Sequence, residues 1–341
     1  MLDPATRIAV AGAGSIGCYA GGCLALAGRK VTLLARPRIV EAVGKTGLTI
    51  VDLDGSERKL APSVLVAKVD PAEAFAGAGL VLVTVKSNDT AEIAETIARL
   101  APPDATVVSL QNGTGNAARL RQLLPATQRV VAGMVPFNVV QDETPDGRLV
   151  FRRTTSGQMH VEAGVPGLVE LLDVEGCEAA PAADMAAVLW GKLILNLGNA
   201  INALSGLPLA EQLADRRWRL LLAAQMDEAL SVMHRAGIKP VAIGPLRPAL
   251  LPYVLRLPDF LFRLLARRMV SVDPKARSST LQDLDRRRRT ETDEFQGAIV
   301  RLAEQAGMDA PLSRMVLEKI RAAEAAGKGS PQLTPDDLRL P

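Results

Sequence analysis

An uncharged segment from Ile8 to Gly28 is the feature of this chain that most constrains its fold. It is long enough to cross a bilayer, which takes about 20 apolar residues in a helix. Six glycines interrupt it, and each glycine in a helix interior costs about 1 kcal/mol relative to alanine. The segment divides better into a buried strand over 8–11, a glycine turn and a helix over 16–27. With a second strand over 31–34, it predicts a β-α-β unit rather than a membrane span or a signal peptide.

The turn of this unit carries a glycine fingerprint. Its residues are Gly12, Ala13, Gly14, Ser15, Ile16 and Gly17, which match G-x-G-x-x-G at a strand-to-helix junction. The missing side chains allow a tight turn, close approach of the backbone to a pyrophosphate and close packing of helix on strand. Free N–H groups at the helix start favour phosphate. The pattern predicts dinucleotide binding, with a purely structural glycine turn as the alternative.

The end of the second predicted strand indicates which dinucleotide is bound. An NAD site would place an acidic residue there, about 20 residues after the glycines, to hold the ribose 2′-hydroxyl. Here Leu34 and Ala35 are followed by Arg36. A guanidinium can bind a 2′-phosphate through two hydrogen bonds and can stack on the adenine. Arg36 therefore favours NADP(H), and the alternative is an arginine in a solvated loop.

Further apolar runs continue the alternating pattern of strands and helices. Strands are expected over 80–85 and 106–110, with a crossover helix over 90–100 between them. Turn signals at Asp54-Gly55 and Pro145-Asp146-Gly147 predict antiparallel hairpins beside the parallel sheet.

Strand signals stop at about Asp184, and helical patterns follow. We therefore expect an α/β protein with a Rossmann-type NADP-binding domain over 1–178 and a mainly α-helical domain over 179–341. Segment 246–270 is apolar but carries five arginines and three prolines. It predicts a helical excursion against the core, or a partner surface, rather than a membrane span.

Composition excludes several classes of function. Three cysteines are too few and too oddly spaced for a disulfide framework or a four-ligand zinc site, so we expect no metal and a reducing, cytoplasmic compartment. The net charge of +3 gives no electrostatic footprint for nucleic acid. Acidic residues flank the run Arg286–Arg289, which we interpret as a solvated helix face. We expect no nucleic-acid or membrane partner, while a homodimer is left open.

A polar stripe interrupts an otherwise apolar helical segment over 189–199. Lys192, Asn196 and Asn199 stand at i, i+4 and i+7, which places them within about 60° of one another on a helix. With only two histidines in the chain, acid–base chemistry falls to lysine or glutamate. Burial lowers the pKa of a lysine, which suits a general acid near neutral pH. The alternative is a lysine that extends from a half-buried helix into water.

Two further polar residues, Lys86 and Asn112, follow predicted strands. Open α/β sheets bind ligands at the carboxyl edge of their strands. Lys86 is therefore a candidate for contact with cofactor phosphate, ribose or substrate, and Asn112 for contact with a ligand. Each has a plainer interpretation, as a strand-end lysine and as a favourable Asn-Gly turn.

Several motifs taken together resemble the ketopantoate reductases. They are Gly12-x-Gly14-x-x-Gly17, Val83-Thr84-Val85-Lys86, Gln111-Asn112-Gly113, Trp190-Gly-Lys192-Leu-x-x-Asn196, and Ser278-Ser279-Thr-Leu-Gln-Asp283 leading to Arg288-Arg-Thr290-Glu291-Thr-Asp293. The resemblance covers nearly the whole chain in order, and the last two motifs are far more specific than the glycine fingerprint. It implies a helical domain of the 6-phosphogluconate dehydrogenase C-terminal type, with the active site between the two domains. It also implies NADPH-dependent reduction of 2-dehydropantoate to pantoate, in coenzyme A precursor synthesis.

The resemblance also implies roles for individual residues. Lys192 matches the family's general acid, and Asn196 matches its substrate-binding asparagine one helical turn later. Asn112 matches a residue that touches both cofactor and substrate, and Lys86 matches one near the cofactor.

Two more residues with implied roles lie in the last motif. Ser279 matches the serine that binds the substrate carboxylate, and Glu291 matches the glutamate near the nicotinamide ribose and the catalytic lysine. Their spacing corresponds to about 120° around an ideal helix, so both can face one cleft only if Ser279 lies near a bend or a helix start. Asp273-Pro274, just before, favours a helix start there.

One position departs from the family pattern. The family usually carries a second asparagine eight residues after the lysine, where this chain has Ala200. Asn199 or Asn202 must substitute for it, and only Asn199 lies on the stripe with Lys192. This departure and the long 246–270 segment concern the identity of the keto acid more than the reaction.

We hypothesise that hydride passes from NADPH at the glycine turn to the carbonyl carbon of a 2-keto acid held by Asn196, Asn199 and Ser279. Lys192 then protonates the developing alkoxide, and Glu291 keeps Lys192 oriented and charged. One rival is an NADPH-dependent reductase of another 2-keto acid. The other is a non-catalytic NADP(H)-binding sensor, which would bind the cofactor tightly without turnover.

Overall fold

The computed structural model describes residues 2–244, 246–269 and 276–338. The chain divides into two compact units, Met1–Met185 and Ala186–Pro341. No helix in the described part of the chain is long and apolar enough to cross a membrane.

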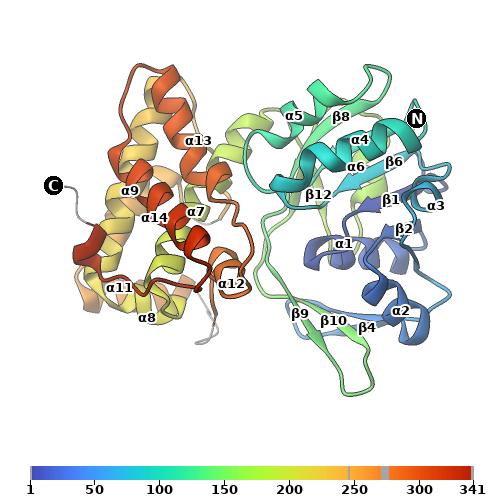
Figure 1. Cartoon of the computed structure of the whole chain (residues 1–341), viewed down its shortest axis with the longest axis horizontal. Coiled ribbons are helices and arrows are strands. Elements are labelled where there is room, and N and C mark those ends of the chain that lie inside the picture. Colours follow the sequence, from blue (N-terminus) through green and yellow to red (C-terminus); the bar gives the residue numbers. More distant parts are fainter. Residues whose placement is uncertain (1, 245, 270–275, 339–341) are drawn as a thin grey trace. The chain divides into compact units, whose positions relative to one another are not determined.

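The first unit is built on an eight-stranded sheet (Figure 1). Its strands stand in the order β12 (Ala179–Ala182), β11 (Met159–Glu162), β8 (Arg129–Met134), β7 (Thr106–Ser109), β6 (Leu80–Val83), β1 (Arg7–Ala11), β2 (Lys30–Leu34) and β5 (Val66–Lys68). The strands from β8 to β5 are all parallel, whereas β11 is antiparallel to β8 and parallel to β12. The predicted Rossmann-type parallel sheet is therefore confirmed.

Helices cover both faces of this sheet, as β1 illustrates. Side chains alternate along a strand, so Ile8 and Val10 join one apolar cluster while Ala9 and Ala11 join another. The first cluster includes α1 (Ser15–Leu26), and the second includes α3 (Pro71–Phe75), α4 (Thr90–Leu100) and α5 (Asn116–Leu123). Burial on both faces explains why these strands are continuous apolar runs in the sequence. The unit also contains α2 (Pro37–Thr46), α6 (Leu168–Leu172) and a 3₁₀ turn, η1 (Ser87–Asp89).

A smaller sheet belongs to the same unit. Its four strands stand in the order β4 (Glu57–Leu60), β3 (Leu48–Val51), β10 (Leu149–Arg153) and β9 (Val139–Glu143). The pairs β3–β4 and β9–β10 are antiparallel, and their connections contain Asp54-Gly55 and Pro145-Asp146-Gly147. Both predicted hairpins are confirmed.

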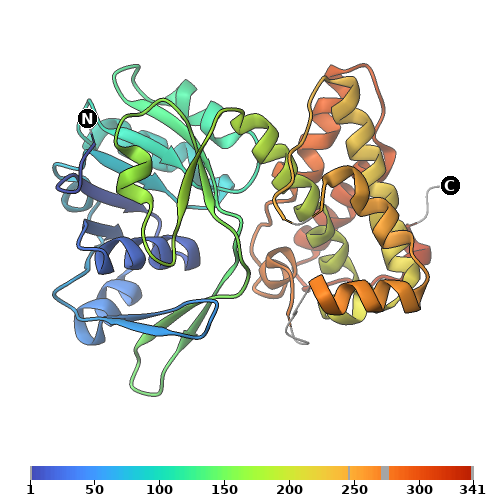
Figure 2. The ribbon, with the colours of Figure 1, turned by 180° about the vertical axis from the view of Figure 1, so that it is seen from behind.

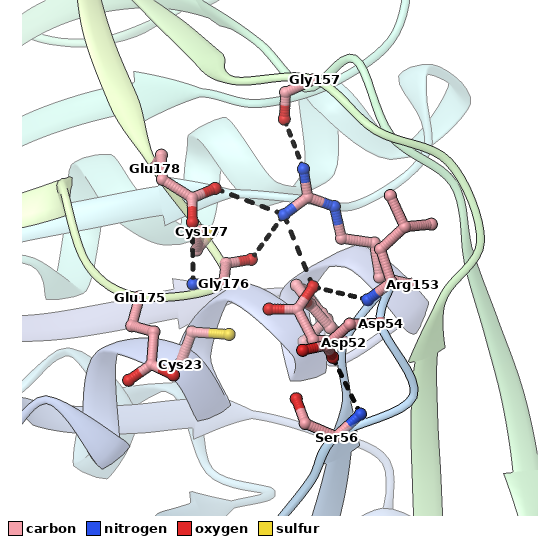
Figure 3. A network of polar contacts seen from close by, with 12 residues as sticks. Cys23, Asp52, Asp54, Ser56, Arg153, Gly157, Glu175, Gly176, Cys177 and Glu178 are labelled. Carbon is pink, nitrogen blue, oxygen red and sulfur yellow. Dashed lines mark hydrogen bonds and ion pairs between the residues drawn. The ribbon is translucent and has the colours of Figure 1, made fainter.

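Arg153, the last residue of β10, ties the small sheet to the segments that precede β11 and β12 (Figure 3). Its guanidinium donates to the carbonyl oxygens of Gly157, at 2.6 Å, and Gly176, at 3.1 Å. It also pairs with Glu178 at 3.3 Å and with Asp52 at 3.7 Å. Because Arg153 is buried, these acceptors replace the water that the charge loses on folding.

Within the described residues the second unit contains no strand. Its elements are α7 (Met185–Ser205), α8 (Leu209–Ala214), α9 (Arg216–Arg235), η2 (Pro248–Leu250), α10 (Leu251–Arg256), α11 (Asp259–Met269), α12 (Ser279–Asp285), α13 (Thr292–Gln305), α14 (Pro311–Ala326) and η3 (Pro335–Leu338). Leu193 and Leu197 of α7 pack with α9 and α13, whereas Ile201 and Leu204 pack with α12 and α14. Because α7 belongs to both clusters, it is the central helix of the unit. The second domain is mainly helical, as predicted, but strand β12 belongs to the first unit, so the division falls at Met185 rather than at 178.

Segment 246–270 is helical, as predicted, through Met269, and residue 270 lies outside the described residues (Figures 1 and 2). Arg219 of α9, which has no exposed surface, anchors this segment. It donates to the carbonyl oxygens of Leu255 and Leu257 and pairs with Asp259. Its guanidinium also lies over the ring of Phe262, 4.2 Å from the ring centre.

The prediction that Arg286–Arg289 forms a helix face is wrong. Helix α12 ends at Asp285, and the four arginines form an exposed turn before α13. Arg287 adopts a φ of 54°, a left-handed conformation that cannot continue a right-handed helix.

Candidate active site

The fingerprint loop joins β1 to α1. Gly12 has a φ of 112°, which favours glycine, and its carbonyl oxygen accepts a 2.6 Å hydrogen bond from the Thr84 hydroxyl. The N–H of Ala13 donates to the Leu34 carbonyl at 3.1 Å, which fixes the loop against β2. A Cβ on Gly17 would lie 2.1 Å from the Gly12 oxygen. Position 17 therefore requires glycine for packing alone.

Gly14 differs from its neighbours because a Cβ built on it would meet no heavy atom within 4 Å. It caps α1, whose start carries no side-chain cap and no acidic residue in its first turn. Ser15 and Ile16, the first residues of the helix, are only partly buried. The open side of Gly14 leaves room beside the uncapped N–H groups of the helix start, and such groups favour phosphate.

The predicted cofactor residues of the first unit lie at one edge of its sheet. The fingerprint loop follows β1, Arg36 follows β2, Lys86 follows β6 and Asn112 follows β7. Because these four strands are parallel neighbours, their carboxyl ends meet at the same edge. The chain runs from β1 to one side for β2 and to the other side for β6, which is the position where open α/β sheets bind ligands.

Arg36 is an exposed residue at the N-cap of α2. Arg38, two residues later, pairs with Glu143 at 2.6 Å. The structure records no hydrogen bond or ion pair of the Arg36 side chain within residues 2–244, 246–269 and 276–338. Of these two arginines, Arg36 is the one available to an anionic ligand.

A buried polar network that the sequence analysis missed holds the loops after β6 and β7 together. The Ser87 hydroxyl donates to the Asn112 carbonyl at 3.1 Å, and the Asn116 amide donates to the same carbonyl at 2.6 Å. Gln111 donates to the Thr90 hydroxyl at 2.8 Å, and that hydroxyl donates to Asn116 at 3.0 Å. The network fixes the backbone at Asn112 while leaving this residue exposed. Polar residues directly after apolar strands were the signal that could have identified it.

In the second unit, α7 carries the predicted polar stripe. Lys192 and Asn199 are partly exposed and Asn196 is 9% exposed. Burial lowers the pKa of Lys192 from 10.5 to about 8. A Cβ on Gly191 would lie 2.1 Å from the Val241 carbonyl oxygen, so the chain after α9 packs directly against α7 beside the lysine. This contact was also missed, because a glycine inside a helix does not identify its neighbour.

Helix α12 begins at Ser279, as the sequence predicts, but it ends before Glu291, which belongs to the start of a separate helix, α13. The expected spacing of about 120° along one helix is therefore wrong. The N-cap is Ser278, whose hydroxyl accepts a 3.2 Å hydrogen bond from the Leu281 N–H. Asp273-Pro274, which favoured this helix start, lies outside the described residues. Ser279 is exposed, whereas Ser278 is buried. The two adjacent serines thus have different roles, one structural and one available to a ligand.

Glu291 is the N-cap of α13 and is partly exposed. Its backbone is fixed on both sides, because the Thr290 and Thr292 hydroxyls lie 2.9 Å apart and the Thr290 N–H donates to Glu324 at 2.6 Å. The predicted site residues thus form two groups, one in each unit. The described residues contain no group of three or more histidine, cysteine, aspartate or glutamate side chains that could hold a metal.

Two family models match this chain, one in each of its two units. Residues 8–165 match the family model "Ketopantoate reductase PanE/ApbA", and residues 184–324 match its C-terminal counterpart. The 2-dehydropantoate 2-reductase of Halobacterium salinarum is 30% identical over 94% of this chain and 100% of that protein. The enzyme of the same name from Archaeoglobus fulgidus is 29% identical over 94% of this chain and 98% of that protein.

A solved structure shows the same similarity over the whole fold. The PanE/ApbA family ketopantoate reductase from Ralstonia eutropha JMP134 is 32% identical, with a TM-score of 0.78 over 95% of this chain and 100% of that chain. The chain described here belongs to the ketopantoate reductase family.

Proposed function

We propose that this protein reduces 2-dehydropantoate to pantoate with NADPH. The observation that carries the proposal is Lys192, which stands with Asn196 and Asn199 on one stripe of α7 in a chain that belongs to this family. Its pKa of about 8 leaves the ammonium protonated at neutral pH but able to release its proton to an alkoxide.

The first unit supplies features that fit a phosphorylated dinucleotide. The open side of Gly14 and the uncapped start of α1 suit the pyrophosphate, and the exposed Arg36 suits a 2′-phosphate. Lys86 and Asn112 follow neighbouring strands at the same sheet edge. When bound there, NADPH would supply the hydride.

The residues of the second unit would bind and protonate the substrate. The Ser279 hydroxyl would donate a hydrogen bond to the substrate carboxylate. Asn196 and Asn199 would form hydrogen bonds with the other oxygens of the substrate. The Lys192 ammonium would polarise the keto oxygen and then transfer a proton from Nζ to it as the carbon gains the hydride. The resulting neutral amine would be protonated again from solvent, with Glu291 favouring the charged form.

The test is an NADPH oxidation assay, followed by absorbance, across a panel of 2-keto acids that includes 2-dehydropantoate. We expect 2-dehydropantoate to give the highest kcat/KM and Lys192→Ala to lose at least 100-fold, in the range that acid–base catalysis contributes (about 10²–10⁴). Lys239→Ala, which removes an exposed lysine of the same unit, is the matched control. Turnover that survives in Lys192→Ala would contradict the proton-donor role.

A second candidate is a reductase of a different 2-keto acid. It is favoured by Ala200, which is fully buried in an apolar cluster at the position where the family pattern has an asparagine. Preference for another member of the panel would support it. Tight NADPH binding with no turnover on any member would instead indicate a sensor and contradict both reductase proposals.

A further inference from the structure

Asn202 lies where α7, the loop before α8 and the start of α12 meet. Its side chain has no exposed surface. The amide nitrogen donates to the Leu207 carbonyl at 2.9 Å and to the Gln212 amide oxygen at 3.1 Å. The amide oxygen accepts from the Ser278 N–H at 3.0 Å. Both N–H groups and the oxygen are thus engaged inside the protein, which leaves Asn202 unable to hold a substrate.

Ser278 completes a second connection between α12 and α7. Its hydroxyl donates to the Asn199 carbonyl oxygen at 3.0 Å while accepting from the Leu281 N–H. The chain just before it is also held, because the Leu209 N–H donates to the Ala276 carbonyl at 2.9 Å. The exposed Ser279 is therefore fixed next to the turn of α7 that carries Asn199.

These contacts matter because α12 spans only Ser279–Asp285. Isolated helices shorter than about 12 residues are marginal in water, so a helix of this length depends on tertiary contacts for its position. The two hydrogen bonds of Ser278 to α7 come from the residue that directly precedes Ser279. Their loss would free the Ser279 hydroxyl to move relative to Asn199.

We infer that Asn202 and Ser278 form a clamp that positions Ser279 beside Asn199, and that the clamp sets the affinity for the keto acid carboxylate. This inference rests on the proposed function. It assigns Asn202 as a positioning residue and leaves Asn199 as the asparagine that substitutes for the family's second amide.

The test compares steady-state constants for 2-dehydropantoate in Ser278→Ala, Ser278→Thr and Asn202→Ala. We expect KM for the keto acid to rise about tenfold in Ser278→Ala and Asn202→Ala, as the loss of about one hydrogen bond implies. KM for NADPH and the pH dependence of kcat should not change. Ser278→Thr keeps the hydroxyl and should stay within about twofold of wild type.

Glu228→Ala is the matched control for a loss of stability alone. Its carboxylate accepts from the Leu312 and Ser313 N–H groups at 2.8 Å, so its loss uncaps α14 and keeps both hydrogen bonds of Ser278 to α7. We expect a lower Tm with an unchanged keto acid KM. An equal rise of KM in Glu228→Ala, or a wild-type KM in both Ser278→Ala and Asn202→Ala, overturns the clamp alone. A wild-type protein that turns over no 2-dehydropantoate contradicts the proposed function and the clamp together.

Discussion

Replacing Lys192 with methionine removes a largely buried ammonium and keeps a side chain of similar length. Burial lowers the pKa of Lys192 from 10.5 to about 8. At about 1.36 kcal/mol for each tenfold change in proton affinity, the charged side chain is about 3 kcal/mol less favourable in the folded protein than in the unfolded chain. We therefore expect Lys192→Met to be about 3 kcal/mol more stable than wild type near pH 7.

The pH dependence of this difference has a definite sign. The folded pKa is the lower one, so between about pH 8 and pH 10.5 the unfolded chain binds more protons than the folded protein. Wild-type stability should rise with pH across that window, by up to about 1.4 kcal/mol per pH unit from this group. Below about pH 8 the side chain is protonated in both states, and the full cost remains. The advantage of Lys192→Met should therefore be greatest near pH 7 and vanish near pH 10.5.

Activity should follow the opposite trend, because a general acid must carry its proton. We expect kcat/KM for the keto acid to be constant below about pH 8 and to fall about tenfold per pH unit above it. Urea denaturation of both proteins between about pH 7 and pH 10 measures the free energy of unfolding, and NADPH absorbance measures the rate. A stability difference that does not change with pH, or a rate that stays flat to about pH 10, would refute the reasoning.

Three further predictions concern the remaining features. Arg36→Asp should weaken NADPH binding 10- to 100-fold, the loss of a charged hydrogen bond of about 1.5–3 kcal/mol, and should improve NADH binding. Unchanged NADPH affinity in a fluorescence titration would assign Arg36 to a solvated loop. Gly17→Ala places a Cβ 2.1 Å from the Gly12 oxygen and should lower the free energy of unfolding by about 2 kcal/mol, whereas Gly14→Ala should change it by less than about 1 kcal/mol and weaken only cofactor binding. Equal destabilisation by the two variants would contradict the distinction between the packed and the open glycine. Arg219→Met leaves two carbonyl oxygens and Asp259 without their donor and should lower the free energy of unfolding by about 3 kcal/mol; a loss below about 1 kcal/mol would show that α10 and α11 are held by apolar packing alone.

The β-α-β unit could be predicted from sequence because its signals are local. An apolar run, a glycine turn, an uncharged helical stretch and a second apolar run follow one another within Arg7–Leu34. Once the strands are parallel, the positions of Arg36, Lys86 and Asn112 at one edge follow from topology without any side-chain information.

The buried polar contacts could not be predicted, because each joins residues far apart in sequence. Thr84 contacts Gly12, and Ser278 contacts Asn202, yet nothing in a threonine or a serine indicates its partner. The prediction of a helix over Arg286–Arg289 is wrong for a different reason. Helix α12 ends because Arg287 adopts a left-handed backbone conformation, and the sequence does not show when a residue other than glycine adopts that conformation.

This chain has an asparagine at position 199, whereas the family pattern has one at position 200. The two positions face different directions on α7. Neighbouring residues on a helix point about 100° apart. Ala200 points into the apolar cluster that contains Ile201 and Leu281, where an amide without a partner would cost about 1–3 kcal/mol. Asn199 lies instead on the stripe with Lys192 and Asn196. On the proposed function, the keto acid would therefore meet a narrower row of polar groups on α7 than the family pattern provides. The number of polar groups is the same in both rows, so on the proposed function we expect the change to alter the direction from which α7 holds the keto acid rather than the number of substrate oxygens that it holds.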